Sequence, residues 1–237
     1  MIDAAPGPMA LVGSGEFTPA TEAVDLALLE GRARRAVFLP TAAAPEGPET
    51  VSYWVELGRS HYQRLGVEAT PLLVLNRDDA EREELAAEIS GAGLVYLSGG
   101  DPTYLASALV GTSVGNAIRD AWAAGTAVAG CSAGAIALTQ YVPDIRHLER
   151  PAGRGLGLVS NLAVMPHFDQ LEKWMPGATQ WALDALPDGM RLIGVEEETA
   201  LVGGPHTWRV IGRRRVWELH RGGNHIRHHD GDIVEID

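Results

Sequence analysis

The sequence predicts an α/β fold: a doubly wound, mostly parallel sheet with helices on both faces and antiparallel strands toward the C-terminus. Three observations indicate it. Short apolar runs without polar alternation recur in the first 140 residues, as in strands buried on both faces. Segments with helical periodicity separate these runs, which is the pattern of βαβ units. Toward the C-terminus, short strand-like segments follow one another with turns between them.

The elements of the first part can be placed in chain order. Apolar runs bounded by Gly, Pro or Ser predict strands over residues 9–13, 36–40, 72–75, 93–97 and 126–129. Thr18 and Pro19 open a helix after the first strand, because a capping residue and a proline at the first position are typical helix starts. Further helices are predicted over residues 53–65, 78–89, 103–124 (in one or two pieces) and 133–140.

The pattern changes after Tyr141. Residues 143–157 are rich in Pro, Gly and Arg and have no clear period, which predicts a loop. A strand over residues 162–165 and a helix within residues 170–186 follow. The remaining short strands are predicted over residues 192–195, 200–202, 207–211 and 216–219 and near Ile233, with residues 212–215 as a hairpin turn. No break in composition divides the chain, so we expect a single domain over residues 1–237.

Composition narrows the class of protein. The chain has 237 residues, and 31 acidic against 19 basic residues give a formal net charge of −12. Such a chain is a poor partner for nucleic acids and anionic membranes, which select basic surfaces. Residues 121–143 carry no charge, but they are mostly Ala, Gly, Thr and Ser, which is weak for membrane insertion. We therefore expect neither a nucleic-acid partner nor a membrane span.

The single cysteine, Cys131, permits no intrachain disulfide, and the N-terminal residues show no basic start or apolar run of a targeting segment. Both observations fit a reducing compartment, so we expect a cytoplasmic protein, as a monomer or a homodimer. The sequence indicates no cofactor, because it has no phosphate-binding loop or dinucleotide fingerprint. The adjacent His228 and His229 are expected to be solvated, so no metal site is predicted.

Gly130-Cys-Ser-Ala-Gly134 is the sharpest motif in the chain. It matches G-x-S-x-G and lies between a predicted strand and a predicted helix, which is the context of a nucleophile elbow. Ser132 is then the candidate nucleophile, near a helix N-terminus that favours developing negative charge. The alternative is a plain strand–helix turn with a capping serine. Cys131, the rival nucleophile, is expected to point into the protein as a small hydrophobe.

A serine nucleophile needs a base and an orienting acid. His167 directly follows a predicted strand, so we expect it at the same sheet edge as the elbow. His147 lies in the loop after the elbow, and His61, in an early helix, is expected on the solvated surface. The run Glu196-Glu-Glu198 also follows a strand. One of its carboxylates could hold His167, and at least one is expected to face water.

Ser98-Gly99-Gly100-Asp101 ends another predicted strand. Ligands of open parallel sheets bind at the carboxyl ends of strands. A Gly-Gly pair there can offer backbone N–H groups to an oxyanion without side chains in the way. The alternative is a plain turn in which Asp101 caps the next helix.

These motifs together resemble one known family. Gly99-Gly100-Asp101, Gly130-Cys-Ser-Ala-Gly-Ala135, Pro166-His-Phe168 and Gly194-Val-Glu-Glu-Glu-Thr-Ala200 are similar, in order and spacing, to the serine peptidase family that contains dipeptidase E and cyanophycinase. The resemblance runs from the first strand to about Leu201. It implies a fold like the class I glutamine amidotransferases, with serine in place of cysteine.

The resemblance also implies a set of catalytic residues. Ser132 would be the nucleophile, His167 the general base and Glu197 the acid, with Glu196 as the nearest rival for the last role. Gly100 and Ala133 would supply the oxyanion N–H groups. The implied activity is that of a serine-type exopeptidase, which hydrolyses short peptides through an acyl-enzyme.

The chain departs from the family at one point. Members that cleave after an N-terminal aspartate are expected to bind its carboxylate with a basic residue after the catalytic histidine. Residues 168–190 have Lys173 as their single basic residue and contain no arginine. This does not favour aspartyl specificity. The candidate substrate-binding residues are Asp101, Arg146, Arg150 and Trp174.

Two other interpretations stay open. An α/β-hydrolase esterase or amidase has the same motif with the chain order Ser, acid, His, which Ser132, Asp184 or Asp188, and His225 could supply. Against this interpretation, the order of the candidate residues here is Ser, His, Glu. The sheet predicted beyond the elbow is also too short for an α/β-hydrolase. A non-catalytic binding module on the same fold would be expected to lack the serine or the histidine, and the chain keeps both.

Overall fold

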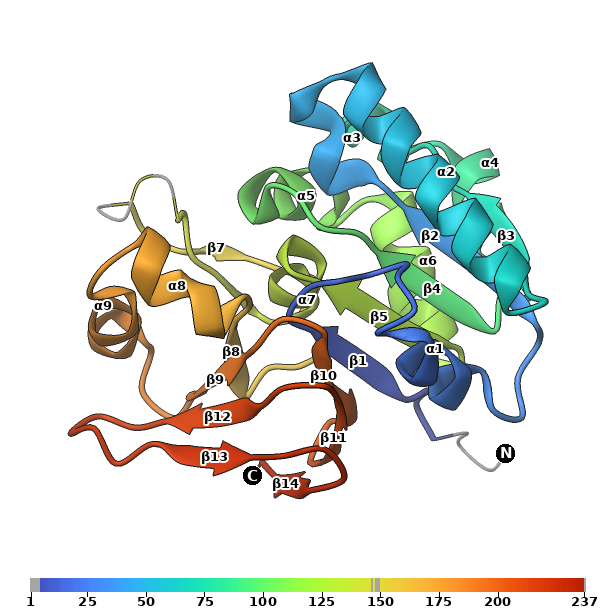
Figure 1. The fold of residues 1–237 in the computed structure, drawn as a ribbon. Coiled ribbons are helices and arrows are strands. Elements are labelled where there is room, and N and C mark those ends of the chain that lie inside the picture. Colours follow the sequence, from blue (N-terminus) through green and yellow to red (C-terminus); the bar gives the residue numbers. More distant parts are fainter. Residues whose placement is uncertain (1–4, 146, 148–149, 237) are drawn as a thin grey trace.

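The computed structural model of the protein describes residues 5–145, 147 and 150–236. In this part of the chain, eight strands form a central sheet in the order β14-β11-β10-β1-β5-β4-β2-β3 (Figure 1). The strands from β1 to β3 in this order are parallel, and β10, β11 and β14 add an antiparallel edge. The strands are β1 (Met9–Val12), β2 (Arg35–Leu39), β3 (Glu68–Pro71), β4 (Leu94–Leu97), β5 (Ala127–Cys131), β10 (Thr199–Gly203), β11 (Thr207–Gly212) and β14 (Ile233–Glu235).

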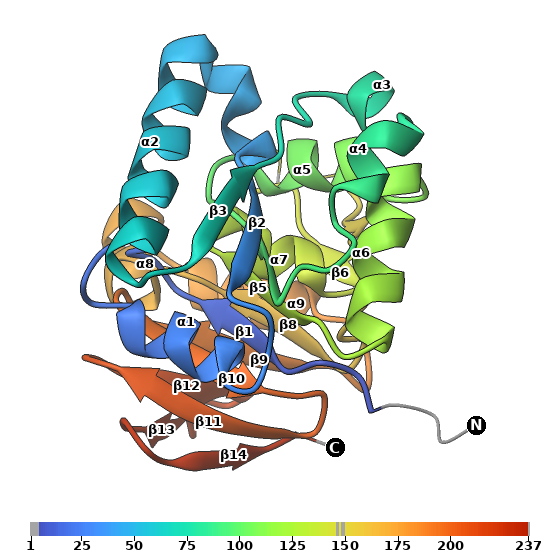
Figure 2. The same ribbon diagram turned by 90° about the vertical axis from the view of Figure 1, so that its right-hand side faces the viewer.

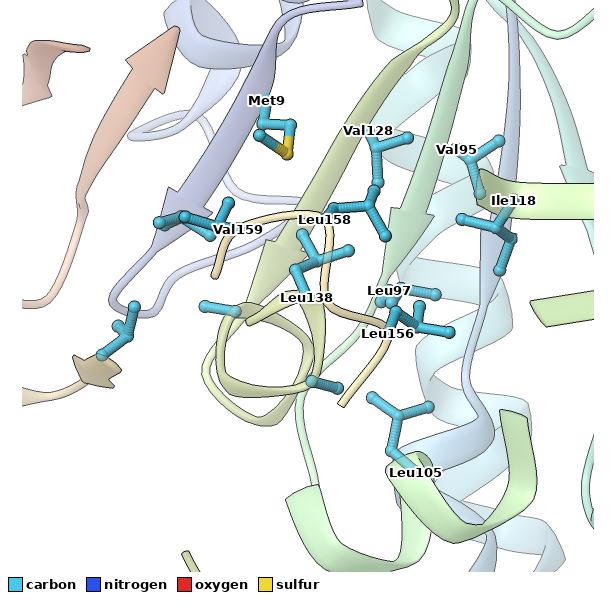
Figure 3. Packing of buried hydrophobic residues seen from close by; sticks show 14 of the residues in the cluster. Met9, Val95, Leu97, Leu105, Ile118, Val128, Leu138, Leu156, Leu158 and Val159 are labelled. Carbon is cyan, nitrogen blue, oxygen red and sulfur yellow. The ribbon is translucent and has the colours of Figure 1, made fainter. Parts of the chain in front are cut away.

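Helices cover both faces of this sheet (Figure 2). One face packs on α1 (Glu22–Leu29) and α2 (Pro48–Arg64) through an apolar cluster. A larger cluster joins the other face to five helices. Figure 3 shows part of it, with Met9, Val95 and Val128 from strands packed near Ile118 and Leu138 from helices. These helices are α3 (Arg77–Ala80), α4 (Glu83–Ala87), α5 (Pro102–Leu109), α6 (Ser113–Ala123) and α7 (Ala133–Leu138). The predicted mixed α/β fold is therefore confirmed.

A second sheet of four strands, in the order β13-β12-β9-β8, lies beside the first in the described part of the chain. Val195 and Val216 from this sheet share an apolar cluster with Leu201 and Val210 from the first. Two helices join β8 to β9 and pack on the same sheet; they are orange in Figure 1. These elements are β8 (Leu162–Met165), α8 (Phe168–Trp174), α9 (Ala178–Ala185), β9 (Arg191–Val195), β12 (Val216–Leu219) and β13 (Ile226–His228).

The loop predicted over residues 143–157 contains a short strand, β7 (Gly153–Arg154), which pairs with β6 (Tyr141–Val142). A 3₁₀ helix, η1 (Thr41–Glu46), follows β2. None of the helices in the described residues is both long and apolar enough to cross a bilayer.

Several elements differ in position from the prediction. The strand expected at residues 72–75 is β3, four residues earlier. Leu72 and Val74 bury their side chains beyond the paired residues, although the Leu72 N–H still donates to the Phe38 carbonyl of β2. The first helix begins at Glu22, since the Thr18 and Thr21 hydroxyls instead donate to the Gly15 carbonyl in a turn.

Two further predictions concern breaks and pairing. The helix expected over residues 78–89 is split into α3 and α4, and Asn76 caps α3 by accepting from the Asp79 N–H. Residues 212–215 are not a hairpin turn, because β11 pairs within the first sheet and β12 within the second. They cross from one sheet to the other.

His61 is buried, which contradicts the surface position expected for it. Its Nε2 lies 2.6 Å from Asp25 Oδ2, and both side chains are almost fully covered by α1, α2 and the Phe17 ring. The hydrogen bond between the two side chains offsets part of the cost of burying these polar groups. Burial raises the pKa of the Asp25 carboxyl above its usual value, and the hydrogen bond from His61 opposes that shift.

Candidate active site

Ser132 stands at a sharp turn between β5 and α7. Its backbone has φ 50° and ψ −109°, a conformation that non-glycine residues rarely adopt and that proteins retain mainly at functional sites. The glycines on either side let the helix pack onto the sheet. A Cβ on Gly130 would lie 2.3 Å from the Gly134 carbonyl carbon, and a Cβ on Gly134 would lie 2.1 Å from the Leu97 oxygen. The motif therefore forms a strained strand–turn–helix at the carboxyl end of β5.

His167 lies beside this turn. It follows β8 and precedes α8, in a left-handed conformation with φ 51°. Its Nε2 is 3.0 Å from Ser132 Oγ, within hydrogen-bond distance. Its Nδ1 is 3.1 Å from Glu197 Oε1. With the proton on Nδ1, His167 donates to Glu197 and accepts from the Ser132 hydroxyl.

The parallel strands β8 and β9 bring His167 and Glu197 together. Met165 pairs with Gly194, so the residues that follow each strand emerge at the same sheet edge. The side chains of His167 and Glu197 are each about one quarter exposed. The three residues named by the resemblance therefore form one hydrogen-bonded chain in the order Ser132, His167, Glu197.

The neighbouring glutamates point elsewhere. Glu196 is 6% exposed and accepts hydrogen bonds from the Trp217 indole N–H and the Arg215 backbone N–H. Glu198 pairs with Arg213 at 3.2 Å near the surface. The carboxylates of Glu196 and Glu198 thus bind groups other than His167. The geometry favours Glu197 as the partner of His167.

Asp169 holds the turn that carries Glu197, and sequence reasoning did not find it. Its Oδ1 accepts from the Glu197 backbone N–H at 2.9 Å, and its Oδ2 lies 2.5 Å from an Arg214 guanidinium nitrogen. Burial acts to raise the pKa of Asp169, but the hydrogen bonds from the Glu197 amide and Gln170, together with Arg214, hold it below the usual value. The carboxylate stays ionised, so this brace is a charged one.

Two backbone N–H groups are available beside Ser132. The Gly100 N–H has no hydrogen-bond partner among the described residues, and Ala133 opens α7, where the first N–H groups lack intrahelical partners. The N–H of Ser132 itself donates to the Val12 carbonyl at 2.9 Å. Gly100 and Ala133 are thus the pair that could bind an oxyanion.

Glu16 positions the loop that carries Gly100. It is buried, follows the end of β1, and accepts from the Gly99 N–H at 2.9 Å and from the Cys131 thiol at 2.8 Å. A Cβ on Gly100, which has φ 139°, would lie 2.3 Å from the Ala42 oxygen, so this loop is also held by close packing. Sequence reasoning missed Glu16, although its place after a strand at the elbow edge was a usable signal.

Cys131 points into the protein, away from the cavity beside Ser132. Burial raises the pKa of its thiol well above the usual value, and the nearby Glu16 carboxylate raises it further. A thiolate is the reactive form of cysteine, so this environment disfavours Cys131 as a nucleophile.

The proposed substrate-binding residues lie in different places. Asp101 caps α5 by accepting from the Tyr104 N–H. Trp174 is 62% exposed and its ring lies 5.4 Å from the His167 ring. Arg150 is exposed and pairs with Asp144, outside the cavity that adjoins Ser132. Arg146 lies outside the described residues. Trp174 is therefore the member of this set that borders the nucleophile through that cavity.

The residues required by the α/β-hydrolase alternative are not brought to Ser132. Asp184 pairs with Gln180, Asp188 with Arg221, and His225 accepts from the His220 backbone N–H. His228 pairs with Glu218. Within the described residues, no three His, Cys, Asp or Glu side chains are grouped as a metal site would require.

Comparison with known families identifies the family of the chain. The model of peptidase family S51 matches residues 9–211. The chain belongs to peptidase family S51. This is a family of serine peptidases. The matched residues include Ser132, His167 and Glu197.

Curated relatives include cyanophycinases. The chain is 30% identical over 165 residues to the cyanophycinase of Synechococcus elongatus, a match that covers 65% of this chain and 50% of that protein. It is 27% identical over 143 residues to an uncharacterised peptidase of Listeria innocua, covering 56% and 64%. The S51 chain thus spans about half the length of the cyanophycinases that it matches.

Solved structures of two peptidases share the fold. A peptidase from an acI-B1 actinobacterium is 37% identical, with a TM-score of 0.91 and coverage of 99% of this chain and 98% of that one. A putative peptidase E from Listeria monocytogenes has a TM-score of 0.61 at 17% identity, with coverage of 98% and 100%, and shows likeness of fold alone.

Proposed function

We propose that this chain is a serine-type exopeptidase that hydrolyses short peptides, with Ser132, His167 and Glu197 as its triad. The observation that carries the proposal is the hydrogen-bonded chain from Ser132 Oγ through His167 to Glu197. It joins a strained nucleophile, a base at 3.0 Å and an acid at 3.1 Å from that base. This is the arrangement by which triads on unrelated folds are identified.

In the proposed reaction, Ser132 Oγ attacks a peptide carbonyl carbon while His167 Nε2 takes the hydroxyl proton. Glu197 stabilises the imidazolium through Nδ1–H. The carbonyl oxygen becomes an oxyanion bound by the Gly100 and Ala133 N–H groups. His167 then gives its proton to the leaving amine as the C–N bond breaks. Water, activated by the same histidine, hydrolyses the acyl-enzyme and restores Ser132.

The cavity that adjoins Ser132 has the size of a pocket for one side chain of a peptide. It measures about 240 Å³, below the roughly 300–1,000 Å³ of sites that enclose whole drug-sized ligands.

Peptide cleavage by the wild type and by Ser132→Ala tests the proposal. The purified protein is incubated with a mixed library of short peptides that includes α- and β-aspartyl dipeptides and C-terminally blocked peptides, and products are read by mass spectrometry. Cleavage near one terminus by the wild type alone is expected. In parallel, a fluorophosphonate should label Ser132 by displacement of fluoride. Equal cleavage by Ser132→Ala, or no cleavage and no labelling, would overturn the assignment.

A further inference from the structure

An apolar cavity opens directly beside the candidate nucleophile. Ser132, Ala133, Gly100 and His167 are part of its lining. Strands β8 and β9 and helices α7, α8 and α9 also contribute to it. Its apolar lining residues include Ala163, Leu192, Ile136, Leu171, Met175 and Trp181.

The described lining of the cavity carries no Asp, Glu, Lys or Arg. Its polar groups lie mainly at the Ser132 end, and the Tyr141 hydroxyl, also in the lining, donates to the Ala185 carbonyl. An ionised carboxylate or ammonium group placed here would lose its hydration without gaining a counter-charge, which is strongly unfavourable. An apolar group would instead leave water for a matching surface.

The volume fits one large side chain. A dry cavity of about 150 Å³ lined by aliphatic and aromatic groups is known to bind benzene, and the present cavity measures about 240 Å³. A benzyl, isobutyl or indole group therefore fits, whereas a methyl group would leave most of the cavity unfilled. Trp181 and Met175 offer the aromatic and thioether contacts that planar rings favour.

Small side chains on packed elements form the cavity. Ala163, Ala178 and Ala182 are buried in the cluster that fixes α9 onto β8 and β9. Their small side chains create the space, since a larger residue at any of them would project into it or into that cluster. The cavity is thus formed by small residues on well-packed elements.

We propose that this cavity is the specificity pocket of the enzyme, and that it selects peptides with a large apolar side chain next to the scissile bond over aspartyl peptides. The inference rests on the proposed function, because it takes Ser132 as the residue that attacks the bond. It assigns selection to apolar contacts from α8, α9 and β8. Arg150 and Arg154, which are exposed and do not line the cavity, have no part in it.

A binding experiment tests the pocket without requiring turnover. Ser132→Ala protein is titrated with the dipeptides Phe-Ala, Leu-Ala, Ala-Ala and Asp-Ala and with the reversed sequences, and tryptophan fluorescence reports binding because Trp174 and Trp181 border the cavity. The Phe and Leu peptides of one series should bind about 10- to 100-fold more tightly than Ala-Ala. Asp peptides should bind no better than Ala-Ala. Tighter binding of the Asp peptides, or equal binding of all, would overturn the proposal.

The same peptides are then offered to the wild type, with fluorophosphonate labelling of Ser132 as a separate readout. Cleavage with kcat/KM rising from Ala to Leu and Phe in one series is expected, and that series shows which side of the bond the pocket serves. Cleavage without this preference would refute the pocket and leave the peptidase assignment standing. Binding of the apolar peptides without labelling or cleavage would support the pocket and refute the peptidase assignment.

Matched variants on α9 locate the effect. Ala182→Leu adds bulk inside the cavity, whereas Ala185→Leu makes the same change at an exposed position of the same helix. Ala182→Leu should lower the ratio of kcat/KM for Phe over Ala peptides at least about 10-fold, and Ala185→Leu should leave that ratio unchanged. Met175→Ala, which adds no bulk, should raise KM for Phe peptides and serves where Ala182→Leu fails to fold. Equal ratios in all variants would overturn the proposal.

Discussion

The two sheets contribute to the site in different ways. At the strand ends of the eight-stranded sheet, the main chain does the positioning. Ser132 is held at positive φ between two closely packed glycines, and Gly100 offers its own N–H. At the strand ends of the four-stranded sheet, side chains do it. His167 and Glu197 bind one another, and Asp169 braces the Glu197 turn.

The elements that would position the reacting groups are therefore different from the elements that would select the substrate. The proposed nucleophile and oxyanion donors depend on close backbone approach, which few substitutions can preserve. The helices that line the apolar cavity connect β8 to β9 and contribute only side chains to it. Substrate preference can therefore change on α8 and α9 without disturbing the elbow, and substitutions in the two regions should have distinct kinetic effects.

The largest effects are expected at the side chains of the second sheet. His167→Ala removes the base and should lower kcat by about 10⁵-fold or more, as in other serine peptidases. Glu197→Gln leaves the imidazole in place but disfavours its correct tautomer and should cost up to about 10⁴-fold. Both are measured as kcat on the best peptide from the library.

Glu198→Gln is the matched control for Glu197→Gln. It alters the next carboxylate, which pairs with Arg213 near the surface, and should change kcat by no more than about threefold because exposed ion pairs contribute little. If Glu198→Gln proves as damaging as Glu197→Gln, the assignment of the acid is wrong.

The next effect concerns the main chain of the first sheet. Gly100→Ala would force a Cβ to within 2.3 Å of the Ala42 oxygen and displace the N–H donor. We expect kcat to fall by about 10²–10³-fold, the usual cost of losing one oxyanion donor. Gly111→Ala, also at positive φ but with open space around it, controls for backbone strain alone. Similar kcat values for the two variants, each checked for folding by its Tm, would argue against Gly100 as a donor.

A smaller effect is expected behind the nucleophile. Glu16→Gln can keep one acceptor, but not both, for the Gly99 N–H and the Cys131 thiol, so the oxyanion loop should shift and kcat should fall about 10-fold with little change in KM. Cys131→Ala should keep kcat within about threefold, because it removes the thiol's hydrogen bond to Glu16 but leaves the Glu16 carboxylate to accept from the Gly99 N–H. Iodoacetamide should not modify native Cys131 at pH 8. Rapid modification with loss of activity would revive the cysteine as nucleophile.

Local patterns in the sequence predicted the apolar strands of both sheets, including β8, β9 and β12 of the second. The elbow, the Gly-Gly loop and the buried strands β1, β2, β4 and β5 are encoded by adjacent residues, so periodicity and glycine placement indicate them. The polar edge strand Glu68–Pro71 has no such pattern. The crossing at residues 212–215 depends on which sheet each strand joins, which is a tertiary choice.

Polar pairs between distant segments were also invisible in the sequence. His61 is buried only because Asp25, on another helix, partners it. Likewise, the role of Asp169 depends on the turn at Glu197 and on Arg214, which lies 45 residues further along the chain. The choice of Glu197 over Glu196 came from the family resemblance, and the Trp217 contact that engages Glu196 could not be seen in the residue run.

The smallest effect compares two carboxylates whose pKa values shift in opposite directions. Asp169, in the second region, has a lowered pKa, so its contribution to stability is present above the unfolded-state value of about 4 and is lost as pH falls through the folded-state value. Asp25, in the first region, has a raised pKa because of burial. Its contribution is present below about pH 4 and is lost as pH rises through the folded-state value.

Urea unfolding of the wild type, Asp25→Asn and Asp169→Asn between pH 3 and pH 8 measures both contributions. Relative to Asp169→Asn, the wild type should lose stability toward acid. Relative to Asp25→Asn, it should lose stability as pH rises, with His61, Glu22 and Tyr62 as the titratable groups that face the carboxylate. Because Asp169 braces Glu197 whereas Asp25 lies away from the triad, only Asp169→Asn should also lower kcat. A parallel loss of kcat in Asp25→Asn would mean that the two regions are coupled through the sheet.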